Sequence, residues 1–175
     1  MKQLRTGATA LMGATAALIS IPAQAAPSFV TSGVALTYTC VEPPYAGGES
    51  DFILSLTASV LVVKGQTINL TASIQSADGS AVAVPAQGVS STLDINVSGA
   101  VTTTVTATGL TDKTAVAVGE QVLQTGGTAS LPASTAGYHA FEPGEFVTTT
   151  WMDTVLDCTP DSTAVAARTQ VLPLP

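Results

Sequence analysis

The two cysteines of the chain, Cys40 and Cys158, constrain its fold more than any other feature. Their even number and the export signal described below predict one disulfide bond between them. Such a bond requires the two Cα atoms to lie roughly 4.4–6.8 Å apart, and a separation beyond about 7 Å would rule it out. Two free thiols in a redox or metal site would need close spacing or neighbouring histidines, and the sequence offers neither. We therefore expect the first strand to lie beside a segment near the end of the domain.

The N-terminal segment has the three parts of a secretory signal peptide. Lys2 and Arg5 precede an Ala-rich apolar run, which ends in Ala23-Gln24-Ala25. A short apolar run with this exit is typical of a cleaved signal and not of a membrane anchor. We predict residues 1–25 as signal peptide, 26–33 as an N-terminal linker and 34–175 as a single domain. The protein would then be secreted or held at the cell surface, with no membrane span after cleavage.

The charge of the chain narrows the classes of partner. Beyond residue 25 only Lys64, Lys113 and Arg168 are cationic, against twelve acidic residues, which leaves a formal charge of −9. A surface with so few cations cannot neutralise several phosphates, so we expect no nucleic-acid partner. Binding to an anionic lipid surface is disfavoured for the same reason.

The apolar residues of the domain recur at every second position. This alternation is clear in 34–40, 67–74 and 100–108, where Thr and Val are abundant. It is typical of β-strands, and no stretch keeps the helical period of 3.6 residues. Short strands separated by Gly and Pro predict an all-β fold, a two-sheet immunoglobulin-like sandwich closed by the disulfide. In this arrangement we expect Trp151 to be buried against the disulfide.

Three short motifs support a comparison with a known group of proteins. They are Tyr38-Thr39-Cys40, the Lys64-Gly65 turn after a Val-rich strand, and Cys158-Thr159-Pro160. With these motifs the chain resembles secreted actinobacterial β-sandwich domains without assigned function. The resemblance implies a protein of the cell envelope or the extracellular space, and it implies no catalytic residues.

Two groups of residues invite an enzymatic interpretation. His139 is the only histidine, and a hydrolase would use it as a general base, but no Gly-x-Ser-x-Gly motif accompanies it. Glu142 and Glu145 flank Pro143-Gly144, and paired carboxylates about 5–10 Å apart are the groups that glycosidases use. We favour a loop histidine and a solvated Pro-Gly turn, because lone residues without a motif have little diagnostic weight.

Aromatic residues in predicted loops suggest a binding surface. Tyr45 and Tyr138 lie in segments rich in Gly and Pro, and binding residues concentrate on such loops. Together with His139 and Glu142 they are the candidate ligand-facing loop residues.

Metal binding has weak support in the sequence. One histidine and two bridged cysteines cannot supply the usual zinc ligands. Calcium stays an alternative, since Asp153, Asp157 and Asp161 recur every four residues and Glu49 and Asp51 flank a Gly-rich loop. The calcium-loop motif is missing, so we favour solvated carboxylates and predict no cofactor.

These observations predict a secreted, non-enzymatic β-sandwich that serves as a structural or interaction module of the cell envelope or extracellular space. Its partner would be an envelope protein or a glycan. The alternative is a carbohydrate-binding or glycan-hydrolysing protein that uses loop aromatics and acidic residues.

Overall fold

A computed structural model describes residues 28–30, 33–42 and 47–174. This part of the chain is built from β-strands and contains no helix, so none of the described residues form a helix that could span a membrane. The all-β class predicted from the sequence is confirmed. The strands are β1 (Ser28–Val30), β2 (Val34–Val41), β3 (Gly48–Ser59), β4 (Leu61–Val63), β5 (Thr67–Gly79), β6 (Val89–Gly99), β7 (Thr103–Asp112), β8 (Gln121–Pro132), β9 (Gly137–Thr150), β10 (Val155–Pro160) and β11 (Ala167–Leu172).

The alternation in the sequence determines which side of each strand faces the core. In β5, Ile68 and Leu70 are buried whereas Thr67, Asn69 and Thr71 are exposed. Successive side chains of a strand point to opposite faces, so a period of two separates an apolar inner face from a polar outer one.

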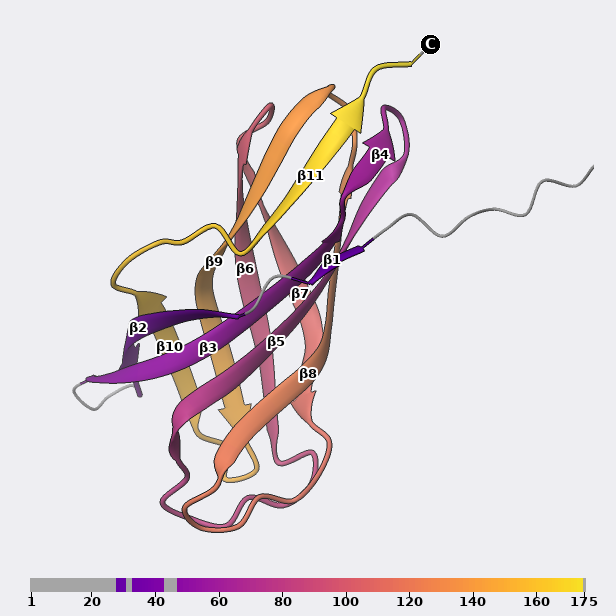
Figure 1. The fold of residues 1–175 in the computed structure, drawn as a ribbon. Coiled ribbons are helices and arrows are strands. Elements are labelled where there is room, and N and C mark those ends of the chain that lie inside the picture. Colours follow the sequence, from indigo (N-terminus) through magenta and orange to yellow (C-terminus); the bar gives the residue numbers. More distant parts are fainter. Residues whose placement is uncertain (1–27, 31–32, 43–46, 175) are drawn as a thin grey trace, which may run out of the picture.

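The strands form one continuous sheet that closes on itself. Neighbouring strands follow the order β10-β2-β3-β5-β8-β7-β6-β9, and β10 also pairs with β9, which completes a circuit. One edge of β9 pairs with β6, and its other edge pairs with β11 near its start and with β10 near its end. In Figure 1, β3 and β5 cross in front of β6 and β9, with the apolar core between these layers.

The predicted division into two separate immunoglobulin-like sheets is not confirmed. Hydrogen-bonded pairing joins the two layers on both sides, through β7 with β8 and through β10 with both β2 and β9. Alternating hydrophobicity reports which face of a strand is buried, but not which strands are neighbours, and so it could not reveal this closure.

Part of the predicted linker is a strand. Within 26–33, residues 28–30 form β1, which pairs antiparallel with the end of β3. The predicted signal peptide, residues 1–25, lies outside the described residues.

The predicted disulfide bond between Cys40 and Cys158 is confirmed. The two residues are direct partners in the antiparallel pairing of β2 and β10, and their Cα atoms are 4.0 Å apart. This separation lies just below the expected range and agrees with the close approach of directly opposite residues in antiparallel strands. The bond joins β2, the first strand of the predicted domain, to β10, which lies near the C-terminal end of that domain.

Three aromatic rings fill the core beside the disulfide. The ring of Tyr38 lies 5.7 Å from that of Phe52 and 4.9 Å from that of Phe146, and the two phenylalanine rings are 5.0 Å apart. Tyr38 is fully buried, and its hydroxyl donates a hydrogen bond of 3.0 Å to the carbonyl oxygen of Gly144. Phe146 is the direct strand partner of Cys158.

The prediction that Trp151 packs against the disulfide is wrong. Trp151 follows the end of β9, and 38% of its surface is exposed. It lines a surface depression together with residues of two loops, among them Pro85 and Val116. Phe146, five positions earlier and on the inward face of β9, occupies the place that the sequence suggested for the tryptophan.

Burial of Tyr38 predicts a loss of stability in alkali. Burial raises the pKa of the Tyr38 hydroxyl, whereas in the unfolded chain this pKa stays near its ordinary value of about 10. Ionisation therefore favours the unfolded chain, and its penalty on stability begins as the pH rises above about 10. We expect Tyr38→Phe to lose about 1 kcal/mol at neutral pH, with its hydrogen bond, and to fall less steeply than the wild type in alkali. Urea unfolding across this pH range measures both slopes, and parallel slopes would contradict the prediction.

Candidate functional site

Strand β9 carries three of the four side chains that the sequence singled out as ligand-facing. Tyr138, His139 and Glu142 lie on this strand and not in a loop. The fourth, Tyr45, lies outside the described residues. Because neighbouring positions of a strand face opposite sides, the three residues do not converge on one site.

Pro143 and Gly144 lie within a strand and not in the predicted turn. Both residues are buried within β9, at a point where its register with β6 shifts between Leu93 and Ile95. A Cβ on Gly144 would lie 3.0 Å from the Asn96 side-chain nitrogen and 3.1 Å from the Asp94 carbonyl oxygen, so β6 leaves little room for a side chain here. Proline inside a strand is found at such irregularities, and this pair makes a bulge and not the predicted solvated turn.

His139 is buried between the layers, contrary to the prediction of a loop or rim residue. It is 1% exposed, and its Nδ1 lies 3.3 Å from the carbonyl oxygen of Gly137. Among the described residues its Nε2 has no hydrogen-bond partner. A general base must reach the proton that it removes from a substrate. The inward orientation of His139 keeps it from a surface-bound substrate.

The outward side of β9 presents a different group of residues. Tyr138, Ala140 and Glu142 alternate with the buried positions, and Tyr138 is 72% exposed. On the neighbouring strand β11, Gln170 lies opposite Tyr138 and Arg168 lies opposite Ala140. We call these five residues the Tyr138 face.

A groove borders the Tyr138 face on the side of β11. Its lining includes Tyr138, Arg168 and Gln170, together with the apolar side chains of Leu61 and Val165. Leu61 belongs to β4 and is the parallel partner of Gln170. One row of neighbouring strands thus places the tyrosine ring, the glutamine amide and the leucine side by side.

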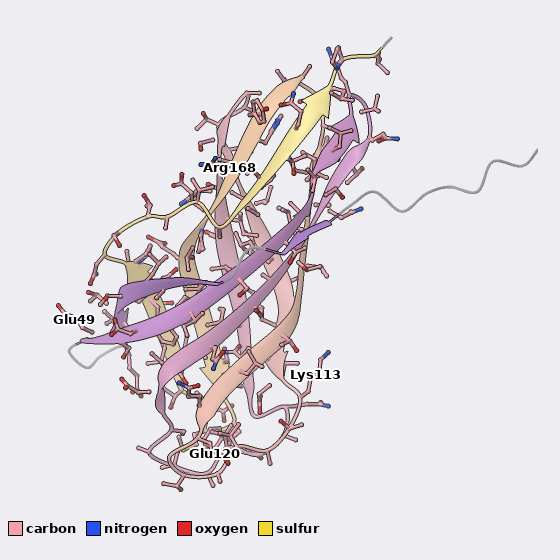
Figure 2. All side chains as sticks on the ribbon, viewed as in Figure 1. Glu49, Lys113, Glu120 and Arg168 are labelled. Carbon is pink, nitrogen blue, oxygen red and sulfur yellow. A yellow bond between two sulfur atoms is a disulfide. The ribbon has the colours of Figure 1, made fainter. Side chains whose placement is uncertain are left out.

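Gln170 and Arg168 are the polar residues that β11 contributes to this face. The Gln170 side-chain oxygen is buried and has no partner among the described residues, while its nitrogen donates to the Val171 carbonyl oxygen at 3.3 Å. Arg168 is exposed near the start of β11, far from Lys113 at the lower end of the molecule (Figure 2). No other cation lies on the Tyr138 face, and Glu142 is its one acidic side chain.

The carboxylates proposed for calcium do not assemble into a metal site. The described residues contain no group of three or more acidic, histidine or cysteine side chains suited to a metal ion. Asp51 accepts a hydrogen bond of 2.6 Å from Thr37, and Asp161 accepts one of 3.0 Å from Thr39. Both hydrogen bonds lie at the exposed surface of the sheet.

A buried polar pair that the sequence analysis did not single out lies near the opposite end of the molecule. Asp112 of β7 and Gln124 of β8 are strand partners, and they are 1% and 6% exposed. One Asp112 oxygen accepts a hydrogen bond of 2.7 Å from the backbone N–H of Val89, at the start of β6. The other Asp112 oxygen and the Gln124 side-chain oxygen have no partner among the described residues. The pair interrupts an apolar alternation, which was its only signal in the sequence.

We expect this aspartate to hold the start of β6 in place. Asp112→Ala leaves the buried Val89 N–H without its acceptor and should destabilise the fold by about 1–3 kcal/mol. Asp112→Asn keeps that acceptor and replaces the unpartnered oxygen with a donor, so it should retain most of the stability. Equilibrium unfolding in urea compares the two variants. Equal losses would show that the negative charge matters and not the bond to Val89.

The fold and this face define a disulfide-closed, all-β protein with a mixed aromatic and polar outer surface. Comparison with protein-family models, curated protein sequences and solved structures gives no match for this chain.

Proposed function

We propose that the protein is secreted and acts without catalysis, as a structural or interaction module of the cell envelope or extracellular space. The observation that carries this proposal is the opposite orientation of two adjacent residues. His139, the best candidate for a catalytic base, faces the core, whereas Tyr138 is 72% exposed on the outside. Exposed aromatic side chains held on a rigid strand favour binding over proton transfer.

The disulfide supports the proposed location. Disulfide bonds form and persist in oxidising compartments outside the cytoplasm. The Cys40–Cys158 bond therefore agrees with the predicted signal peptide and with the resemblance to secreted actinobacterial domains. We also keep the immunoglobulin-like description as a proposal, since two strand layers enclose one core even though pairing joins them.

Secretion and catalysis can be tested on the full chain. Expression with the native N-terminus should release a protein that begins at Ala26, as intact-mass measurement would show. A panel of chromogenic glycosides and esters should give no turnover above that of a buffer control. Turnover that His139→Ala or Glu142→Gln abolishes would contradict the non-enzymatic proposal, and retention of residues 1–25 would contradict cleavage.

Carbohydrate binding is the second candidate, and the Tyr138 face favours it. A ring that is 72% exposed lies opposite the Gln170 amide, and the Arg168 guanidinium and the Glu142 carboxylate follow at the next outward positions of the face. These are groups that interact with the two sides of a sugar, its apolar C–H face and its hydroxyls.

A further inference from the structure

We propose that the Tyr138 face binds an uncharged oligosaccharide, with one sugar ring stacked on Tyr138 beside Gln170 and Arg168, and with the next sugar along β9 in reach of Glu142. This inference rests on the proposed non-enzymatic function, because it describes binding without turnover. It assigns that function a site and a class of ligand.

The spacing of the face suits a sugar ring. Tyr138, Ala140 and Glu142 stand two residues apart along β9, so their side chains project to the same side. Alternate positions of a strand are separated by about 6.5–7 Å, which is close to the width of a pyranose ring with its hydroxyls. Ala140, with its small side chain, leaves a shallow floor between the tyrosine and the glutamate. Arg168 stands opposite this alanine and borders the floor on the side of β11.

The apolar part of the site comes from Tyr138 and the adjoining groove. The C–H groups of a sugar face pack against an aromatic ring by dispersion and by contact with its electron-rich face. Leu61 extends this apolar surface, since it follows Gln170 in the same row of strands and is 45% exposed.

The polar part of the site comes from three planar groups. A guanidinium, an amide and a carboxylate each present two atoms in a fixed geometry, which suits pairs of adjacent hydroxyls. Gln170 lines the groove beside Tyr138, and Arg168 is exposed at its border, so its guanidinium N–H groups can donate to sugar hydroxyls.

The charge balance favours an uncharged ligand. The positive charge of Arg168 balances the negative charge of Glu142, so the face has no net charge. The chain beyond residue 25 carries a formal charge of −9. An acidic oligosaccharide would meet this negative field and the Glu142 carboxylate, and repulsion between like charges opposes such a complex.

The test measures binding of neutral and acidic oligosaccharides to the protein purified without its signal peptide. A glycan array selects ligands, and titration calorimetry then compares cellohexaose, xylohexaose, mannohexaose and the best array ligand with hexagalacturonic acid. We expect a neutral oligosaccharide to bind and hexagalacturonic acid not to bind. Tyr138→Ala should weaken binding about tenfold, which corresponds to about 1.4 kcal/mol of lost stacking. Tyr138→Phe should keep most of the affinity, because the ring remains.

The matched control is Trp151→Ala, which removes a partly exposed ring just beyond the far end of β9 and should leave binding unchanged. Unchanged thermal melting of Tyr138→Ala would show that the fold is intact. Failure of every neutral oligosaccharide to bind, full affinity in Tyr138→Ala, or tighter binding of hexagalacturonic acid would overturn the assignment. Chromatography of the bound oligosaccharide separates the two proposals. Cleavage would contradict the non-enzymatic function while binding still depended on Tyr138, whereas absence of binding overturns the site alone.

Discussion

Replacement of both cysteines by alanine should lower the free energy of unfolding by about 4–5 kcal/mol, the largest single effect that we expect in this protein. The bond spans 118 residues of sequence. In the chain-entropy model its loss frees the unfolded chain to adopt many more conformations. For a domain of about 150 residues this loss corresponds to a fall in the melting temperature of roughly 8–20 °C.

The double variant Cys40→Ala/Cys158→Ala avoids the free thiol that a single replacement would leave. The wild type unfolded in the presence of a strong reductant provides the matched control, and its stability should approach that of the double variant. Far-UV circular dichroism should show the same β-rich spectrum below the transition, because β10 also pairs with β9 and not with β2 alone. A loss below about 1 kcal/mol would contradict the view that this bond constrains the unfolded chain.

The strands and the disulfide could be predicted because their signals are local. Ile68, Leu70 and Ile74 alternate with polar residues, and such a period of two reads directly as a strand with one buried face. Two cysteines behind an export signal leave one possible pairing. The closure of the sheet could not be predicted in the same way, since it depends on which strand edges meet. The sequences of β7 and β8, for example, do not indicate that these two strands pair.

Two of the five residues of the Tyr138 face could be suggested from the sequence, but their arrangement could not. Tyr138 and Glu142 were singled out, and both belong to the outward side of one strand. Pro143 and Gly144 suggested a loop, and only the register shift against β6 explains how a strand passes through them. The contribution of Arg168 and Gln170 to this face could not be predicted, because they lie about thirty residues from Tyr138 in sequence. Only the pairing of β11 with β9 brings them close to it.

Replacement of Phe146 by alanine should destabilise the fold by about 3–5 kcal/mol, the cost typical of a large aromatic side chain removed from a packed core. Phe146 is 3% exposed, and its ring contacts those of Tyr38 and Phe52 at 4.9 and 5.0 Å between centroids. Its strand partners are Cys158 on β10 and Leu93 on β6, so the cavity would open where the disulfide meets the core. The rigid strands on both sides limit how far the surroundings can collapse into it.

Comparison with Trp151→Ala sharpens this prediction, because the sequence predicts Trp151 beside the disulfide, whereas the structure places Phe146 there. Trp151 is the larger side chain, but it is 38% exposed, and its removal leaves an open depression and no closed cavity. We expect it to cost roughly half as much as Phe146→Ala, or less. Phe146→Leu should recover part of the loss by refilling the space. Urea unfolding ranks the three variants, and a greater loss for Trp151→Ala than for Phe146→Ala would mean that the tryptophan, and not the phenylalanine, packs against the disulfide.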